Sequence, residues 1–557
     1  MQMNGLVETP DRYGAYPRLS EGQIETLEAR GQRRSTDVGT VLIREGEEGY
    51  DFFVVLAGKV ANYEAYRTPD ERLISVHGPG RFLGELSLFT GQAAFFTSVV
   101  AEPGELLDVP ADALRELVAQ DPALGDLILR AYLIRRSILI GLGVGIRIIG
   151  SRYSQDTRRL REFAARNRLP YRWIDLELDK PAEDLLRQLG VRPEETPVVI
   201  CPGGQVLRNP SNAELARVVG LPAPHLAEAT CDLAIVGAGP AGLAAAVYGA
   251  SEGLVTVALD AIAAGGQAGT SSKIENYLGF PTGISGGELA ERAVLQAEKF
   301  GASFNVPAEA RSLQTREDGH VIGFTDGSEL RTRTVLIATG AHYRKLPVPR
   351  LEEFEKTSVY YAATTAEALM CRNDPVAIVG AGNSAGQATL FLSKYADHVR
   401  LIVRGADLSQ DMSRYLVDRV VRLPNVEIML HTEVRELLGK DSLEALLVED
   451  NQTGQRQLVD ARALFVFIGA EPCTGWLSGT VALDHNGFVL TGRDAEEAGA
   501  QRAFFLETSQ PGVFAAGDVR HGSIKRVASA VGEGSMAVRL VWEYLHTTGR
   551  TVVSAAR

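Results

Sequence analysis

Residues 232–242 read DLAIVGAGPAG and decide the fold of the longest part of the chain. A short apolar strand runs into the pattern Gly-x-Gly-x-x-Gly, and an Ala-rich helix follows it. Glycines are needed there because the turn is tight and because the backbone must approach a pyrophosphate, which rests on the helix N-terminus. The stretch therefore predicts a dinucleotide-binding βαβ unit, with contacts from Gly237, Gly239, Pro240, Ala241 and Gly242.

Residues 376–385 repeat this pattern as VAIVGAGNSA, with Ala385 in place of the last glycine. One such match is also compatible with a plain tight turn. Two matches in full strand–helix context favour two bound dinucleotides, and one chain that holds two of them suggests electron transfer from one to the other. The second set of predicted contacts is Gly380, Gly382, Asn383, Ser384 and Ala385.

The composition limits the class of protein. A length of 557 residues predicts about three to five domains. With 45% hydrophobic and 23% charged residues, the chain has the composition of an ordinary globular α/β protein. The net charge of −13 argues against nucleic acid or an anionic membrane as a partner.

The N-terminal residues lack the charged-then-apolar plan of a signal peptide. The most apolar stretch, Ile138–Ile149, is short and contains Arg147, so we expect no membrane span. The expected location is cytoplasmic. No metal ligand set is predicted, and the four cysteines form neither a disulfide scaffold nor a CxxC motif; they are Cys201, Cys231, Cys371 and Cys473.

Three units precede the long α/β region. Residues 36–115 read as short strands separated by turns, which predicts a small β-barrel or jelly roll. A Leu-rich helical stretch is expected from Ala111 to Ile140. A β-α-β-α-β-like run follows, with helices at Gln155–Asn167 and Ala182–Leu189 and one strand across PVVICPGGQVL.

Asp260 ends the strand VTVALD, where an acidic side chain accepts hydrogen bonds from a ribose. From about residue 231 to 548 the chain resembles the thioredoxin reductase family of pyridine-nucleotide flavoproteins. The matching pieces occur in the family's order, and they are GGQ (265–267), IENYLGFP (274–281), IATGA (337–341) and GVFAAGDV (512–519).

This resemblance implies bound FAD and a homodimer. Asp518 would meet the ribityl chain, and the family's Arg-Gln-Ala flavin contact is replaced here by Lys525-Arg526-Val527. The other FAD contacts that it implies are Asp260, Gly266, Gln267, Asn276 and Gly340.

The strand after the second fingerprint ends in Arg404, where an NAD enzyme usually has an acidic residue. A guanidinium there suits the 2′-phosphate of NADPH through a charge-assisted contact. Relatives that prefer NADPH carry an arginine cluster, of which this chain keeps only Arg404, and Arg414 would compensate. We therefore favour NADPH, with NADH as the open alternative.

Thioredoxin reductases of this type carry Cys-x-x-Cys just before the second fingerprint, where a thiolate accepts electrons from the flavin. This chain has Ala362 and Thr365 at the two cysteine positions. No protein side chain is assigned as catalytic, because the flavin carries the chemistry. We expect Cys371 to be a buried structural residue. Reduced flavin must then pass its electrons to an external acceptor, either a small redox protein or a small molecule.

Residues 36–115 resemble a cyclic-nucleotide-binding domain, with the segment 80–88 (GRFLGELSL) as its phosphate-binding cassette. The resemblance assigns Glu85 to the ribose 2′-hydroxyl and the amides of Gly84 and Leu86 to the phosphate. Phe95 occupies the position of the arginine that pairs with that phosphate. Its loss should weaken cAMP binding roughly 10- to 150-fold, so we expect a degenerate pocket.

Residues 146–220 resemble a thioredoxin or glutaredoxin fold, with Thr196-Pro197 at the position of that family's cis-proline. Ser151-Arg-Tyr-Ser154 stands where its CxxC would open the first helix, so this unit also lacks redox sulfur. An ordinary β-α-β unit remains the alternative, and an adapter role is the expected function.

The sequence thus predicts a multidomain α/β protein with two Rossmann-like domains behind a cyclic-nucleotide-binding-like barrel and a thioredoxin-like domain. The predicted boundaries are 1–140, 146–222, 231–345 with 473–557 for FAD, and 346–472 for NAD(P)H. The predicted function is an FAD-dependent NAD(P)H oxidoreductase with an external acceptor. Two alternatives stay open: a nucleotide- or redox-responsive flavoprotein sensor with slow turnover, and a thioredoxin reductase that uses a partner's cysteines.

Overall fold

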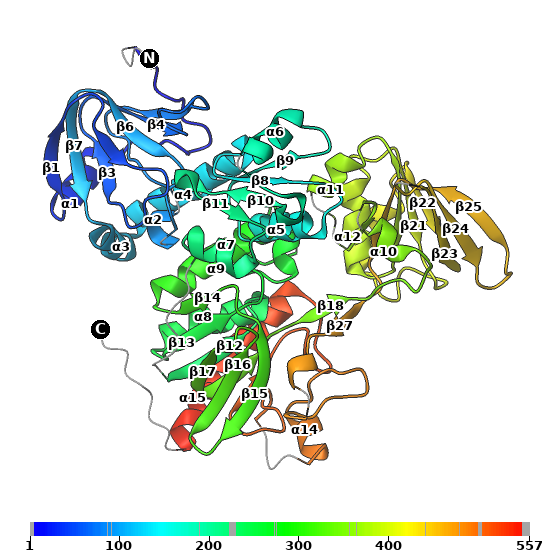
Figure 1. The fold of residues 1–557 in the computed structure, drawn as a ribbon. Helices are drawn as coiled ribbons and strands as arrows, with labels where there is room; N and C mark the ends of the chain where they lie inside the picture. Colours follow the sequence, from blue (N-terminus) through cyan, green and yellow to red (C-terminus); the bar gives the residue numbers. More distant parts are fainter. Residues whose placement is uncertain are drawn as a thin grey trace. The chain divides into compact units, whose positions relative to one another are not determined.

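The computed structural model describes residues 5–548, apart from positions 86, 91, 189, 222–229, 272, 275, 356, 362, 364, 441, 478 and 500–503. The chain forms two compact units, and Figure 1 labels their helices and strands. The first comprises Met1–Ala229, Val257–Ala264 and Val294–Glu309, and the second comprises Thr230–Thr256, Gly265–Ala293 and Ala310–Arg557. Within the described residues, no helix has both the length and the apolar character that a bilayer crossing requires.

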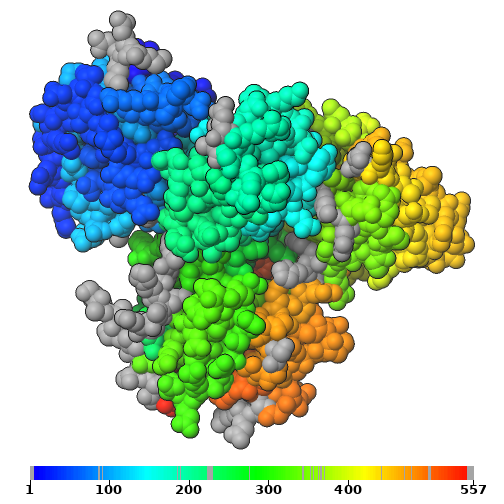
Figure 2. All heavy atoms as spheres, viewed as in Figure 1, coloured from blue at the N-terminus to red at the C-terminus, as the bar shows by residue number. Residues whose placement is uncertain are grey.

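The N-terminal barrel consists of two antiparallel sheets, as the sequence predicts. Their side chains contribute to an apolar core that includes Phe52, Val54 and, from the segment after β5 (Arg72–His77), Phe82. The barrel is drawn in blue in Figure 2. The first sheet has the strand order β1 (Gln32–Thr36), β7 (Gly104–Val109), β3 (Phe52–Val55). The second sheet has the order β2 (Val41–Ile43), β6 (Thr97–Glu102), β4 (Lys59–Glu64), β5. The helices are α1 (Glu21–Glu28) and α2 (Ser87–Thr90).

The helical stretch predicted after the barrel is confirmed, and the structure divides it into two helices. Helix α3 (Ala111–Gln120) ends at Asp121, whose side chain then caps α4 (Pro122–Leu142) by accepting from the amides of Ala123 (3.0 Å) and Leu124 (3.1 Å). Proline is suited to the first position of α4, since its missing N–H would have no helical partner there. Asp121 therefore ends α3 and begins α4 as a separate helix.

The next module has a four-stranded sheet with the order β11-β10-β8-β9, in which β8 and β9 are parallel and β10 is antiparallel to both neighbours. The strand predicted across 197–207 is in fact a hairpin, since the turn Pro202–Gly204 divides it. The predicted cis bond at Thr196-Pro197 is confirmed. The elements are β8 (Ile146–Gly150), α5 (Gln155–Arg166), β9 (Tyr171–Asp175), α6 (Lys180–Gln188), η1 (Pro193–Glu195), β10 (Val198–Ile200), η2 (Pro202–Gly204), β11 (Val206–Arg208) and α7 (Asn212–Val218).

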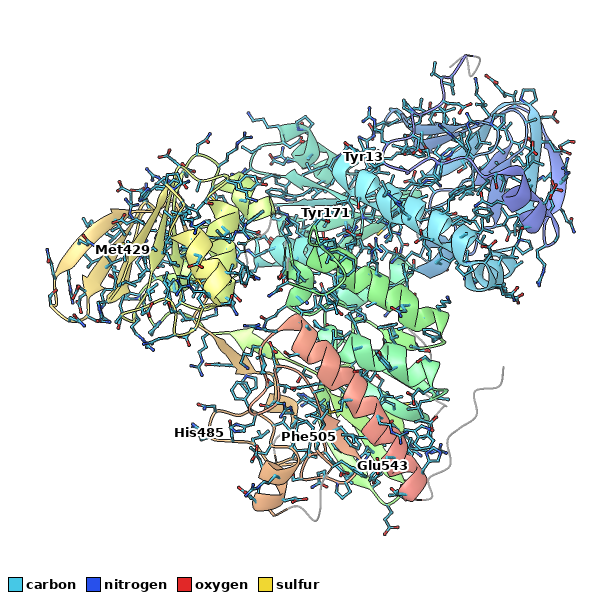
Figure 3. All side chains as sticks on the ribbon, turned by 180° about the vertical axis from the view of Figure 1, so that it is seen from behind. Tyr13, Tyr171, Met429, His485, Phe505 and Glu543 are labelled. Carbon is cyan, nitrogen blue, oxygen red and sulfur yellow. The ribbon has the colours of Figure 1, made fainter. Side chains whose placement is uncertain are left out.

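In the second unit, β12 leads into the first fingerprint and pairs in parallel with β17. Strand β17 also pairs in parallel with β28 and antiparallel with β16. Helix α15, seen from behind in Figure 3, packs against α8, and Gly534 permits the contact because a Cβ there would lie 2.0 Å from the carbonyl oxygen of Ala241. The elements of this half are β12 (Cys231–Val236), α8 (Pro240–Ser251), η3 (Ala268–Thr270), β15 (Ala310–Arg316), β16 (Gly319–Phe324), β17 (Glu329–Ile337), η4 (Gly475–Leu477), α14 (Arg493–Glu497), β28 (Val513–Ala515) and α15 (Val527–Thr547). Strands β13 (Thr256–Leu259) and β14 (Ser303–Asn305) pair in parallel, and α9 spans Gly286–Lys299.

The second fingerprint lies in a five-stranded parallel sheet with the order β19-β26-β20-β21-β22, and an antiparallel sheet of β23, β24 and β25 accompanies it. Strands β18 and β27 pair with each other where the chain enters and leaves this half. The elements are β18 (Ala341–Tyr343), α10 (Leu351–Phe354), β19 (Val359–Tyr360), α11 (Thr365–Met370), β20 (Pro375–Val379), α12 (Asn383–Leu392), β21 (His398–Ile402), α13 (Arg414–Val420), β22 (Val426–Met429), β23 (Thr432–Leu438), β24 (Ala445–Asp450), β25 (Arg456–Asp460), β26 (Ala463–Val466) and β27 (Ala470–Pro472).

Glu298 near the end of α9 gives the first unit a pH-dependent stability. Burial raises the pKa of its carboxyl from 4.5 to about 7, and Arg115 only partly opposes the shift. Because the folded state binds the proton more tightly than the unfolded state, stability falls as the pH rises from about 4.5 to about 7, by roughly 3 kcal/mol. We expect Glu298→Gln to remove this dependence and to raise the melting temperature at pH 8.

Melting curves recorded between pH 5 and 8 test this prediction. The matched control on the same helix is Glu288→Gln, whose carboxylate is partly exposed and pairs with Arg292 at 2.8 Å, and we expect it to change stability by less than about 1 kcal/mol. Equal pH profiles for wild type and Glu298→Gln would contradict the assignment.

Candidate functional site: two dinucleotide-binding loops

The first glycines of the two fingerprints have the same structural role. Gly237 has φ +105° and Gly380 has φ +143°, where an L side chain is strained. A Cβ on either residue would lie 2.2 Å from a backbone carbonyl oxygen, that of Ala338 for Gly237 and that of Phe467 for Gly380. Both loops therefore need glycine here for the turn itself, as the sequence predicts.

The loop before α8 forms a glycine-lined cradle. Gly239 is the N-cap of α8 and supplies no side-chain cap, so the first amides of the helix stay available. Gly266 approaches it so closely that a Cβ on Gly266 would lie 3.0 Å from the Cα of Gly239. The amide of Gly265 donates to the carbonyl of Ala238 (2.7 Å) and holds the two segments together. Such a cradle fits a pyrophosphate at the helix N-terminus.

Asp518 and Lys525 lie close together in the segment between β28 and α15. Burial raises the pKa of the Asp518 carboxyl, while Lys525 opposes the shift, and no described residue donates a hydrogen bond to that carboxylate. The Lys525 ammonium donates to the backbone carbonyl of Asp518 (3.2 Å) and lies 4.4 Å from the ring centroid of Phe488. A half-buried carboxylate that lacks a donor fits the hydroxyls of a ribityl chain.

The other residues that were predicted to contact FAD have the following surroundings in the structure. Gln267 donates through its side-chain amide to the carbonyl of Ala341, Gly340 accepts from the amide of Cys473 (3.0 Å), and Asn276 is exposed. Asp260, which belongs to the first compact unit, accepts from the amides of Ile262 and Ala263 at 3.0 and 3.1 Å. Arg526 is the N-cap of α15 and Val527 is its first residue.

Glu533 on α15 is a residue that the sequence analysis missed. One carboxylate oxygen accepts from the amide of Gly517 (2.7 Å), the residue before Asp518, and the other pairs with Arg520 at 2.6 Å. Both charged side chains are nearly buried, with 14% and 12% of their surfaces exposed. The pair fixes the backbone that presents Asp518. The motif GVFAAGDV gives no signal for it, because Glu533 lies outside the motif.

At the second fingerprint, Gly382 is the N-cap of α12, again without a side-chain cap. The side-chain oxygen of Asn383 accepts from the amide of Ser413 (2.7 Å), which ties this loop to the start of α13. Arg404 lies exposed just after β21, and Arg414 pairs with Asp418 on the surface of α13 at 3.0 Å. Ser384 and Ala385 lie in the first turn of α12.

Three of the four cysteines are poor redox groups. Burial raises the pKa of the Cys201 and Cys231 thiols to about 12 and that of Cys371 to about 11. Cys371 also donates to the carbonyl of Glu367 at 3.0 Å. All four cysteines are free thiols. Of the two positions where relatives carry the dithiol, Thr365 begins α11, and Ala362 lies outside the described residues.

The pocket of the barrel differs from an open ligand site. Gly84 has φ +88°, and the Glu85 side chain is completely buried and paired with Arg136 of α4. Phe95 is 1% exposed, and Leu86 lies outside the described residues. The sequence predicts the missing phosphate arginine, but it gives no indication of the Arg136 partner.

Comparison with known proteins identifies both regions. The pyridine nucleotide-disulphide oxidoreductase family matches residues 231–534, and the cyclic nucleotide-binding domain matches residues 33–121. The "34.2 kDa protein in rubredoxin operon" of Clostridium pasteurianum is 33% identical over 318 residues, which cover 57% of this chain and 98% of that protein. The thioredoxin reductase of Mycoplasmopsis pulmonis is 33% identical over 311 residues, which cover 56% of this chain and 96% of the relative.

Solved structures agree with these matches. The thioredoxin reductase of Lactococcus lactis, in the FR conformation, superposes with a TM-score of 0.53 at 26% identity, covering 57% of this chain and all of that one. The T. acidophilum thioredoxin reductase gives a TM-score of 0.52 at 30% identity, covering 58% of this chain and all of that one. Thioredoxin reductases use FAD and NADPH, which the two glycine loops fit. The chain is thus an NAD(P)H-dependent flavoprotein oxidoreductase, and it belongs to the pyridine nucleotide-disulphide oxidoreductase family.

Proposed function

We propose that the chain passes electrons from NADPH through FAD to an external acceptor without a dithiol of its own. The observation that carries the proposal is the state of the four cysteines. Three are buried with strongly raised thiol pKa values, and none lies at the positions of the family's dithiol. A thiol with a pKa near 11 or 12 forms almost no thiolate at neutral pH and exchanges slowly with disulfides.

The proposed roles of the residues in the second unit are to bind the two cofactors. The cradle at Gly239 and Gly266 would hold the FAD pyrophosphate, and Asp518 would accept from the ribityl hydroxyls. The Gly382 loop would hold the NADPH pyrophosphate, and Arg404 would bind its 2′-phosphate. When bound, FAD supplies the capacity to accept a hydride from the nicotinamide and to release electrons onward. No side chain is assigned as acid or base.

The acceptor that we propose is a small redox protein or a small molecule. The net charge of −13 disfavours nucleic acid as a partner. We also infer, from the strand order β11-β10-β8-β9 with β8 and β9 parallel, that residues 146–222 have a thioredoxin-like fold. Its CxxC positions carry Ser151 and Ser154, which have no redox sulfur, and this supports an adapter role rather than a redox role. Ser151 donates to Glu177 (2.5 Å), and Ser154 accepts from the amide of Thr157 (3.2 Å).

A variant with all four cysteines replaced by serine or alanine tests the proposal. We expect it to bind FAD, to be bleached anaerobically by NADPH as fast as wild type, and to keep turnover with a dithiol-independent acceptor within about twofold. Stopped-flow absorbance of the flavin measures the first step. Steady-state assays with ferredoxin, flavodoxin, quinones and oxygen measure the second.

The outcomes separate the alternatives. A wild-type flavin that neither NADPH nor NADH reduces within seconds would contradict the oxidoreductase and favour a sensor. Rapid thioredoxin turnover by the wild type that the cysteine-free variant loses would contradict the external acceptor. If the protein reduces thioredoxin rapidly only when a second protein with a redox-active cysteine pair is also present, the chain is a reductase that uses a partner's cysteines.

A further inference from the structure

We propose that helix α4 occupies the nucleotide pocket of the barrel from within the chain, and that the Arg136 guanidinium is the permanent partner of Glu85 in place of a cyclic nucleotide. The barrel would then be a fixed joint between the first two modules, closed without any ligand. This inference is independent of the proposed electron transfer.

The contact between Arg136 and Glu85 is deeply buried. Nε of Arg136 donates to Oε2 of Glu85 at 2.9 Å, Nη2 lies 2.8 Å from the same oxygen, and both side chains are 1% exposed. Nη1 donates to the side-chain oxygen of Gln92 (3.0 Å) and to the backbone carbonyl of Arg168 (3.4 Å) in the next module. The carboxylate that a ribose would need is thus already engaged with a cation.

Neighbouring side chains of α4 hold the backbone of the cassette segment (residues 80–88). The Tyr132 hydroxyl donates to the carbonyl of Leu83 at 2.8 Å. Arg135 donates to the carbonyls of Gly84 (2.8 Å) and Phe82 (3.1 Å), and its guanidinium lies 4.6 Å from the centre of the Phe82 ring. Both α4 residues are buried. Three consecutive carbonyls of the segment are therefore bonded to one helix.

Phe95 completes the closure. Its ring lies beneath the Arg136 guanidinium, with 5.2 Å from Cζ to the ring centroid. It belongs to the apolar core of the next module together with Ile146, Phe163 and Leu139 of α4. Helix α4 also supplies Ile128 to the core of the barrel. Helix α4 thus contributes to the apolar cores of both the barrel and the next module, and Phe95 packs in the second of these cores.

The energetics oppose entry of a ligand. A nucleotide that bonded Glu85 would have to displace Arg136 and leave a buried guanidinium without its carboxylate, which is strongly unfavourable. No arginine stands at position 95 to bind the phosphate in return. The pair also ties the cassette segment to α4, which leads directly into β8 of the next module.

Hydrogen exchange of the full-length protein tests the proposal, with cAMP and cGMP as probes at millimolar concentration. In wild type we expect neither nucleotide to change the melting temperature or the protection of residues 80–85 and 122–142. In Arg136→Met we expect exchange in both segments to be at least about tenfold faster, because the buried Glu85 carboxylate loses the guanidinium that neutralises its charge. The double variant Glu85→Gln/Arg136→Met should lose less protection than Arg136→Met alone.

The exposed Arg130 of the same helix provides the matched control, and Arg130→Met should leave exchange unchanged. Nucleotide-dependent protection of residues 80–85 in wild type would overturn the proposal and favour a nucleotide sensor. Unchanged exchange in Arg136→Met would overturn it as well. If Arg136→Met does not fold, the wild-type titration and the double variant still decide the question.

Discussion

Replacing Arg404 with alanine should raise the KM for NADPH about 10- to 150-fold and leave the KM for NADH within about twofold. A charge-assisted hydrogen bond contributes about 1.5–3 kcal/mol, and tenfold in affinity corresponds to 1.4 kcal/mol. Arg404 is exposed just after β21, and its backbone carbonyl is held by the side-chain amide of Asn451 at 3.0 Å. The loop is therefore fixed, and the guanidinium is available to a 2′-phosphate.

Anaerobic reduction of the flavin at graded NADPH and NADH concentrations measures both values. Arg422→Ala is the matched control, because Arg422 is an exposed cation of the same half, and we expect it to change neither. Arg414→Ala tests the second arginine of the same site, which pairs with Asp418. Equal KM values for NADPH in wild type and Arg404→Ala would show that Arg404 is a solvated surface charge.

Replacing Glu533 with alanine should weaken FAD binding about 5- to 150-fold. The change leaves the Gly517 amide and the nearly buried Arg520 guanidinium without their shared acceptor, and an unsatisfied buried donor costs about 1–3 kcal/mol. The Gly517–Asp518 segment then loses its fixed position. Glu533→Gln keeps an acceptor for the Gly517 amide but not the charge, so its effect should be intermediate.

FAD dissociation constants from flavin fluorescence, together with the flavin absorbance envelope and reduction potential, test the Glu533 prediction. A merely structural role would lower the melting temperature without shifting the potential. Glu543→Gln is the matched control near the other end of α15 (Figure 3), where the carboxylate is half-buried and far along the helix from Asp518. Normal FAD affinity and potential in Glu533→Ala would contradict the positioning role.

The parts of the site that were predictable are those in which one backbone geometry demands one residue type. Gly237 and Gly380 could be located because only glycine tolerates their positive φ and their approach to a carbonyl. The cis bond at Thr196-Pro197 was expected from the resemblance of residues 146–220 to a thioredoxin or glutaredoxin fold. Helix ends were less accessible. The break at Asp121 was missed, although a capping Asp before Pro122 is a local signal.

The untested parts of the prediction stay predictions: the domain boundaries, the homodimer, the cytoplasmic location, the individual FAD and NADPH contacts and the electron acceptor. Long-range side-chain partnerships could not be predicted at all. The Glu533–Arg520 pair and the Glu85–Arg136 pair join residues whose spacing follows no periodicity. Charged residues are usually solvated, so their burial gives no sign in the sequence.

The sequence by itself predicted two dinucleotide-binding turns and contains no CxxC motif, because glycine turns and cysteines are properties of single positions. Only the tertiary structure decided what the charged residues do. Burial sets the thiol pKa values, places Glu533 behind the Asp518 loop, and turns Glu85 from a ligand-binding carboxylate into the partner of Arg136. These outcomes depend on which side chains the fold brings together away from water, and that is a property of packing rather than of local sequence.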